Sequence, residues 1–152
     1  MERAIVVAVA GSGEADAATL HVAEDLGAAL AEAGFTVLTG GMGGVMEAVS
    51  RGARSKLGRT IGILPGHDPE DANGWVELAL PTGMGETRNA VIAAAGSALV
   101  AVGRGYGTLS EIAMALKNGR PVIGLGSWDV DGVEAAAGVD EAVSRLVALL
   151  RD

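Results

Sequence analysis

Five short, continuous apolar segments constrain the fold of this chain more than any other feature of its sequence. They cover residues 3–10, 35–40, 59–64, 97–103 and 120–126. Continuous apolar segments of this length are typical of strands buried on both faces of a sheet, whereas half-exposed strands alternate apolar and polar residues. A sixth segment, 75–80, alternates better than the others and predicts an extra strand.

Helical patterns separate these segments. Residues 16–33 carry Leu20, Leu26 and Leu30 at helical spacing, and Gly34 favours a helix end directly after them. Further helices are predicted over 44–56, 86–95, 109–118 and 139–150. This alternation predicts an α/β fold, a Rossmann-like doubly wound parallel sheet with right-handed crossovers, formed as a single domain by residues 1–152.

The composition limits the function classes open to the chain. Its 24 glycines are roughly twice the ordinary share, and they gather where apolar segments end, which favours tight turns and close backbone approach to a ligand. The net charge of −8, without a basic cluster, argues against nucleic-acid partners, since phosphate neutralisation dominates that binding. The lack of cysteine excludes disulfides, thiol catalysis and thiolate metal sites.

We expect a cytoplasmic protein without a membrane span. The apolar start is too short and strand-like for a signal peptide, and no stretch reaches about 18 uninterrupted apolar residues. The acidic loop around His67, Asp68, Glu70 and Asp71 is interpreted as solvated surface, because no rigid frame holds these groups as metal ligands. We therefore predict no metal site and no cofactor required for folding.

The loops at the carboxyl ends of the predicted strands are the candidates for ligand binding, because ligands of doubly wound sheets bind there. Four of these five loops are rich in glycine. The first, "GSGEAD", has Asp16 where a dinucleotide fingerprint needs its third glycine, so an NAD site is disfavoured. Ser12 in this loop is either a phosphate donor or a turn residue, and the sequence does not separate the two.

The second glycine loop, "TGGMGGVMEAV", favours anion binding. Gly40, Gly41, Gly43 and Gly44 precede a predicted helix, and backbone amides at a helix N-terminus bind anions without any basic residue. A strand-to-helix turn alone requires fewer glycines. An acidic protein can therefore still bind a phosphate group here.

Arg88, in "GMGETRN", begins another predicted helix at the same edge of the sheet. An arginine near a helix N-terminus is disfavoured by the helix dipole, which suggests a bound anion or a carboxylate partner. The alternative is a surface arginine paired with Glu86.

The segment "VGRGYGTLSE", residues 102–111, allows two interpretations. Thr108 followed by Glu111 matches a capping box, in which Glu111 bonds back to the backbone and performs no chemistry. The same placement puts a carboxylate beside Gly105 and Gly107 at the strand ends, where it could activate water or hold a hydroxyl. Arg104 has no assigned role.

Together these loops resemble the LOG family, Rossmann-like nucleotide-binding proteins also labelled lysine decarboxylase-like. "GMGETRN" followed by "GYGTLSE", which is similar to the family's Pro-Gly-Gly-x-Gly-Thr-x-x-Glu, is the most specific part, and the match spans almost the whole chain. The resemblance implies one LOG-like nucleotide-binding domain over 1–152. It implies these ligand-contacting residues: Gly11, Ser12, Gly13, Gly40, Gly41, Gly43, Gly44, Met46, Arg88, Asn89, Gly105, Tyr106, Gly107, Thr108 and Glu111.

Two functional hypotheses follow from the resemblance. The cytokinin-activating branch hydrolyses nucleoside 5′-monophosphates to free base and ribose 5-phosphate, and it would make Arg88 and Glu111 catalytic, with the carboxylate stabilising an oxocarbenium-like state. That branch has Arg-Lys where this chain has Arg88-Asn89. The motifs are closer to the molybdenum cofactor carrier subgroup, whose members bind a phosphorylated pterin.

The sequence therefore predicts a carrier or sensor that binds a phosphorylated nucleotide or nucleotide-like cofactor. The ligand would be a nucleoside monophosphate or a phosphorylated pterin. The alternative is a nucleoside 5′-monophosphate phosphoribohydrolase. By the same resemblance we expect a homo-oligomer, a dimer or a tetramer.

Overall fold

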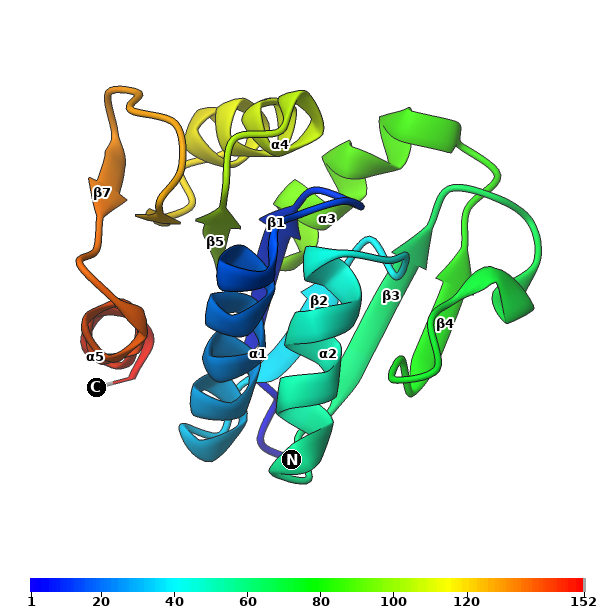
Figure 1. The fold of residues 1–152 in the computed structure, drawn as a ribbon, viewed down its shortest axis with the longest axis horizontal. Helices are drawn as coiled ribbons and strands as arrows, with labels where there is room; N and C mark the ends of the chain where they lie inside the picture. Colours follow the sequence, from blue (N-terminus) through cyan, green and yellow to red (C-terminus); the bar gives the residue numbers. More distant parts are fainter. Residues whose placement is uncertain (152) are drawn as a thin grey trace.

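The computed structural model describes residues 1–151, and its strands and helices alternate along the chain (Figure 1). The strands are β1 (Val6–Gly11), β2 (Thr36–Thr39), β3 (Thr60–Leu64), β4 (Leu78–Pro81), β5 (Ala98–Val102), β6 (Val122–Leu125) and β7 (Val133–Ala135). The α-helices are α1 (Ala17–Glu32), α2 (Val45–Ser55), α3 (Asn89–Ala95), α4 (Tyr106–Lys117) and α5 (Val139–Leu150). Two 3₁₀ helices, η1 (Pro69–Asp71) and η2 (Gly85–Arg88), lie in the loops on either side of β4.

The strands form one parallel sheet in the order β4-β3-β2-β1-β5-β6-β7. The chain proceeds outward from β1 to β4, then returns to place β5 on the other side of β1. The loops that leave β1 and β5 therefore diverge, which creates the crevice where doubly wound sheets bind ligands. The predicted Rossmann-like α/β fold is confirmed.

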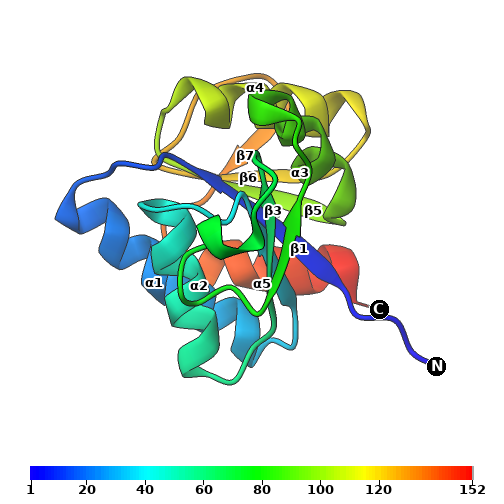
Figure 2. The same cartoon turned by 90° about the vertical axis from the view of Figure 1, so that its right-hand side faces the viewer.

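Helices cover both faces of the sheet (Figure 2). Along β1, Val7 and Val9 pack in the core beneath α1, α2 and α5, while Ala8 and Ala10 pack in the core beneath α3 and α4. The same division holds for β5. Burial on both faces explains why the strand segments are apolar without alternation. Within residues 1–151 no helix is both long and apolar enough to cross a bilayer.

Helices α1 and α2 lie side by side (Figure 1) and approach each other closely enough to bring their backbones into contact. A Cβ atom on Gly27 would lie 1.9 Å from the carbonyl oxygen of Val49, and one on Gly52 would lie 1.9 Å from that of Glu24. Glycine at both positions is therefore required by the packing of the two helices.

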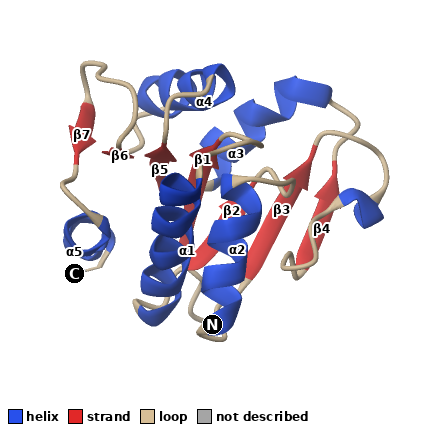
Figure 3. Cartoon of the chain, viewed as in Figure 1, coloured by secondary structure: helices blue, strands red, loops and turns tan. Residues whose placement is uncertain are grey.

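The secondary structure differs from the prediction at several elements (Figure 3), and β1 begins at Val6 instead of at residue 3. The extra strand covers Leu78–Pro81 instead of 75–80, and β7 was not predicted. The helix predicted over 86–95 begins as η2 and becomes α3 only at Asn89. The helix predicted over 109–118 begins three residues earlier, at Tyr106. The reason for this last difference lies in the contacts of the functional site.

Candidate functional site

A cavity of about 360 Å³ opens at the carboxyl ends of the central strands. This volume lies within the range of small-molecule sites, roughly 300–1,000 Å³. Twelve of the predicted site residues line it: Gly11, Ser12, Gly13, Gly40, Met46, Arg88, Asn89, Gly105, Tyr106, Gly107, Thr108 and Glu111. The structure thus brings together residues from four separate loops.

The N-terminus of α4 forms one wall of this cavity. Gly105 is the N-cap in an extended conformation, and Tyr106, Gly107 and Thr108 are the first three helical residues. The capping-box interpretation of Thr108 and Glu111 is wrong, because Thr108 lies inside the helix and no side chain caps it. The first amides of a helix have no intrahelical acceptor, so this wall offers N–H donors and the positive end of the helix dipole.

Two hydroxyl groups converge beside Gly105. A Cβ atom on that glycine would lie 3.6 Å from Thr108 Oγ1 and 3.9 Å from Ser12 Oγ. The Ser12 hydroxyl accepts a hydrogen bond from the Glu14 amide at 3.2 Å, so it does serve the turn, and it also lines the cavity. Thr108 Oγ1 is buried without a hydrogen-bond partner. A buried hydroxyl left unsatisfied costs about 1–3 kcal/mol, which makes this atom a marker for a missing partner.

The loop before α4 is held by the segment that follows β6. Ser127 Oγ donates to the Gly103 carbonyl at 2.6 Å, and Trp128 Nε1 donates to the Gly105 carbonyl at 3.0 Å. These bonds fix the backbone on both sides of Arg104, whose side chain is exposed. They also explain why α4 begins at Tyr106, since they hold Gly105 in the conformation of an N-cap.

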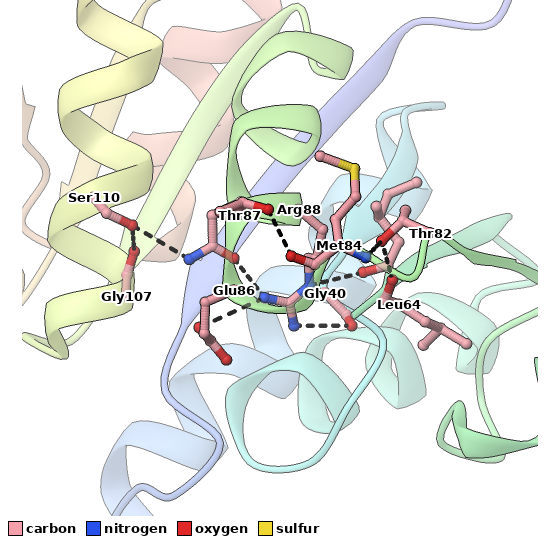
Figure 4. A network of polar contacts seen from close by, with 11 residues as sticks. Gly40, Leu64, Thr82, Met84, Glu86, Thr87, Arg88, Gly107 and Ser110 are labelled. Atoms are coloured by element: carbon pink, nitrogen blue, oxygen red, sulfur yellow. Dashed lines mark hydrogen bonds and ion pairs between the residues drawn. The ribbon is translucent and has the colours of Figure 1, made fainter. Parts of the chain in front are cut away.

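Arg88 forms the opposite wall and ties two strand ends together (Figure 4). Its Nε donates to the carbonyl of Ile63 at 2.9 Å, and its Nη2 donates to the carbonyl of Gly40 at 3.4 Å. The residue is only 6% exposed, so the interpretation as a surface arginine is wrong. Glu86 lies 4.0 Å from the guanidinium but is itself exposed to solvent.

Asn89 connects Arg88 with α4. Its Oδ1 accepts a hydrogen bond from Arg88 Nη1, and its Nδ2 donates to Ser110 Oγ at 3.3 Å. Ser110 in turn donates to the carbonyl of Gly107 at 2.7 Å. An amide can accept from Arg88 and donate to Ser110 at once, whereas a lysine has only donors. Asn89 thus performs a task that lysine at this position could not.

Glu111 faces the same cavity from the second turn of α4 and is 7% exposed. Burial raises the pKa of its carboxyl group to about 8, although the positive charge of Arg88 opposes this shift and the negative charge of Glu86 adds to it. At neutral pH the side chain is therefore mainly protonated and neutral. It can donate a hydrogen bond into the cavity, which a carboxylate cannot do.

We expect Glu111 to make the protein less stable as the pH rises. Between the ordinary pKa of 4.5 and the raised value of about 8, the folded state retains a proton that the unfolded state has released. The free energy of unfolding should then fall by on the order of 5 kcal/mol over this interval because of this group alone. Glu111→Gln should remove that part of the fall, as measured by urea unfolding at several pH values.

The exposed Glu70→Gln is the matched control for this measurement, because it removes a carboxyl group that is not buried. Its pH dependence should parallel that of the unmodified protein. If the plot of the free energy of unfolding against pH for Glu111→Gln is also parallel to that of the unmodified protein, Glu111 ionises normally in the folded state.

The second glycine loop has a structural explanation for most of its glycines. Gly41 and Gly44 have φ angles of 78° and 63°, which side chains with a Cβ rarely adopt. A Cβ atom on Gly40 would lie 2.7 Å from Arg88 Nη2. Only Gly40 of the four lines the cavity, and Gly41, Gly43 and Gly44 lie outside its wall. Binding by those three glycines stays a prediction.

Several cavity residues were not predicted. They are Val9, Ala10, Met42, Pro65, Glu86 and Ile92. Pro65 follows β3 directly and Met42 lies in the loop after β2, so their position at the carboxyl edge of the sheet was the signal that could have found them. In the described part of the chain no three His, Asp or Glu side chains lie close enough to hold a metal ion.

The parallel sheet and the cavity beside β1 define a Rossmann-like protein with a cavity of small-molecule size at the point where the strand order reverses. The sequence matches the family model described as the SLOG cluster4 family over residues 4–148. The chain belongs to this family, and the LOG-like resemblance is thereby confirmed. An uncharacterised protein from Archaeoglobus fulgidus is 44% identical over 119 residues, which cover 78% of each chain.

Two similar solved structures are of molybdenum cofactor proteins. The molybdenum cofactor binding protein from Rippkaea orientalis has a TM-score of 0.91 and 33% identity, over 99% of each chain. The molybdenum cofactor carrier protein from Chlamydomonas reinhardtii has a TM-score of 0.91 and 36% identity, over 99% of this chain and 100% of that one.

Proposed function

We propose that this protein is a carrier that binds a phosphorylated pterin, of the molybdenum cofactor type, in the cavity between Arg88 and the N-terminus of α4. The observation that carries the proposal is the buried hydroxyl of Thr108, which has no partner within the described part of the protein and belongs to a residue that lines the cavity. A phosphate oxygen of the ligand would accept a hydrogen bond from this hydroxyl. The two similar cofactor proteins support the pterin as the attached group.

The phosphate group belongs at the wall formed by Ser12 and the first turn of α4. The amides of Tyr106, Gly107 and Thr108 carry the N–H donors of this helix end, and anions bind at such positions because donors and dipole act together. The hydroxyl groups of Ser12 and Thr108, which both lie beside Gly105, add two donors. The protein can thus bind a phosphate group despite its net charge of −8.

The state of Glu111 favours a carrier over a hydrolase. Cleavage of an N-glycoside passes through a positively charged state, which a carboxylate stabilises by its charge. A Glu111 with a pKa near 8 is mostly neutral at pH 7 and supplies little such charge. As a hydrogen-bond donor it instead suits a pterin, whose ring nitrogens and carbonyl oxygen are acceptors.

The test is Thr108→Val, which removes the hydroxyl while keeping the shape of the side chain. We expect two effects of opposite sign. The unliganded protein should become slightly more stable, because an unsatisfied buried hydroxyl is lost. Binding of neopterin monophosphate, measured by titration calorimetry, should weaken by about tenfold or more, because a hydrogen bond to a charged group contributes roughly 1.5–3 kcal/mol.

Ser50→Ala is the matched control, because Ser50 Oγ is also buried without a partner but does not line the cavity. It should leave the affinity unchanged. Unphosphorylated neopterin should bind the unmodified protein more weakly than its monophosphate does. Its affinity should be the same for Thr108→Val as for the unmodified protein. Equal affinity of the monophosphate for both proteins would contradict the proposal. Release of adenine from AMP, lost in Glu111→Gln, would support the hydrolase instead.

A further inference from the structure

One exposed aromatic side chain at the cavity has no role in the phosphate site. Tyr106 is 83% exposed, although it lines the cavity and occupies the first position of α4. The chain contains only one tyrosine and two tryptophans, and this tyrosine is paired with one of the tryptophans. An aromatic ring that is exposed to solvent beside the cavity indicates a surface on which a planar group of a ligand can stack.

Trp128 supports the tyrosine ring from one side. The two rings are stacked with centroids 5.8 Å apart and an interplanar angle of 29°. The indole is itself anchored, since its Nε1 donates to the Gly105 carbonyl at 3.0 Å and its body packs partly buried against the core under α4. One face of Tyr106 is thus covered by a fixed neighbour, while the residue as a whole stays largely exposed.

We propose that Tyr106 is the residue on which the heterocycle of the ligand stacks, with Trp128 holding the phenol ring in position. This inference rests on the proposed function. It adds the contact by which the protein would distinguish a phosphate ester that carries a heterocycle from one that does not. Tyr106 and Thr108 are two residues apart in the first turn of α4, so one helix end holds both the phosphate group and the ring. Stacking is tolerant of ring substituents, because every flat heterocycle has a π-face.

The experiment compares a ligand that has a ring with one that lacks it. Tyr106→Ala should weaken binding of neopterin monophosphate by about tenfold, in line with alanine substitutions at other stacking residues. It should leave the affinity for ribose 5-phosphate unchanged, because that ligand has no flat heterocycle. Tyr106→Phe keeps the ring and should bind neopterin monophosphate within about twofold of the unmodified protein.

Thr108→Val should weaken both ligands, which separates the phosphate site from the stacking site. If the unmodified protein binds neopterin monophosphate and Tyr106→Ala binds it equally well, the stacking role is overturned while the proposed function stands. If Tyr106→Ala weakens both ligands to the same degree, the tyrosine merely shapes α4, and the stacking role is again overturned. If the unmodified protein binds neither ligand, the proposed function itself fails.

Discussion

Gly27→Ala is expected to destabilise the protein severely, with a loss at or above the upper end of the roughly 1–3 kcal/mol that overpacked cores show. The added Cβ would lie 1.9 Å from the Val49 carbonyl oxygen and 2.9 Å from the Ala53 amide nitrogen. These are backbone atoms of α2, so no side-chain rotation relieves the overlap. The helices must separate, which opens the core over β1. The higher helix propensity of alanine, about 1 kcal/mol, offsets only part of this loss.

Thermal unfolding measures this effect, and a melting temperature lower by about 10 °C corresponds to a loss of roughly 3 kcal/mol at this chain length. Gly52→Ala should behave alike, since its Cβ would meet the Glu24 carbonyl at 1.9 Å. The double variant should lose less than the sum, because the first substitution already separates the helices. Gly74→Ala is the control, because open space surrounds that position. A melting temperature unchanged by Gly27→Ala would contradict the close packing.

Arg88→Met is expected to have the largest effect on ligand binding. Methionine fills the buried site with an unbranched apolar side chain, and the substitution removes the positive charge from the cavity wall. It also leaves the carbonyls of Ile63 and Gly40 without their donor. We expect a loss of stability of about 3 kcal/mol. Affinity for neopterin monophosphate should fall about 100-fold, since an anionic ligand would lose the buried cation.

Arg88→Lys separates the charge from the hydrogen bonds. Lysine keeps the positive charge but lacks the planar fork that reaches both carbonyls, so its stability and its affinity should lie between those of Arg88→Met and the unmodified protein. Urea unfolding and titration calorimetry together test this order. An Arg88→Met protein as stable as the unmodified one would show that the tie between β2 and β3 is dispensable.

The fold was predictable because the strands are buried on both faces and therefore carry an uninterrupted apolar signal. Strand β7 lacked that signal, since it has three residues at the sheet edge and its Glu134 is exposed. The start of α4 was mispredicted because Thr108 and Glu111 fit a local capping pattern, whereas contacts from Ser127 and Trp128 decide where the helix begins. These contacts come from residues distant along the chain, so the local sequence does not reveal them.

Most residues that line the cavity were predictable, but their burial and protonation were not. The glycine-rich loops at the strand ends contain most of the cavity wall. The burial of Arg88 and Glu111 depends on how η2, α3 and α4 pack at one sheet edge; it rules out the surface alternative for Arg88 and places Glu111 in the cavity wall. The expected homo-oligomer and cytoplasmic location stay predictions.

The position of β1 at the centre of the sheet has a consequence for how the protein matures during synthesis. β1 pairs with β2, which follows soon after it, and with β5, which is made much later. Ser12 and Thr108 meet only after that second pairing, so under the proposed function a nascent chain could not bind its ligand before the second half has docked. A ligand that contacts both residues would hold the two halves together, and the protein with bound ligand should resist unfolding more than the protein without it.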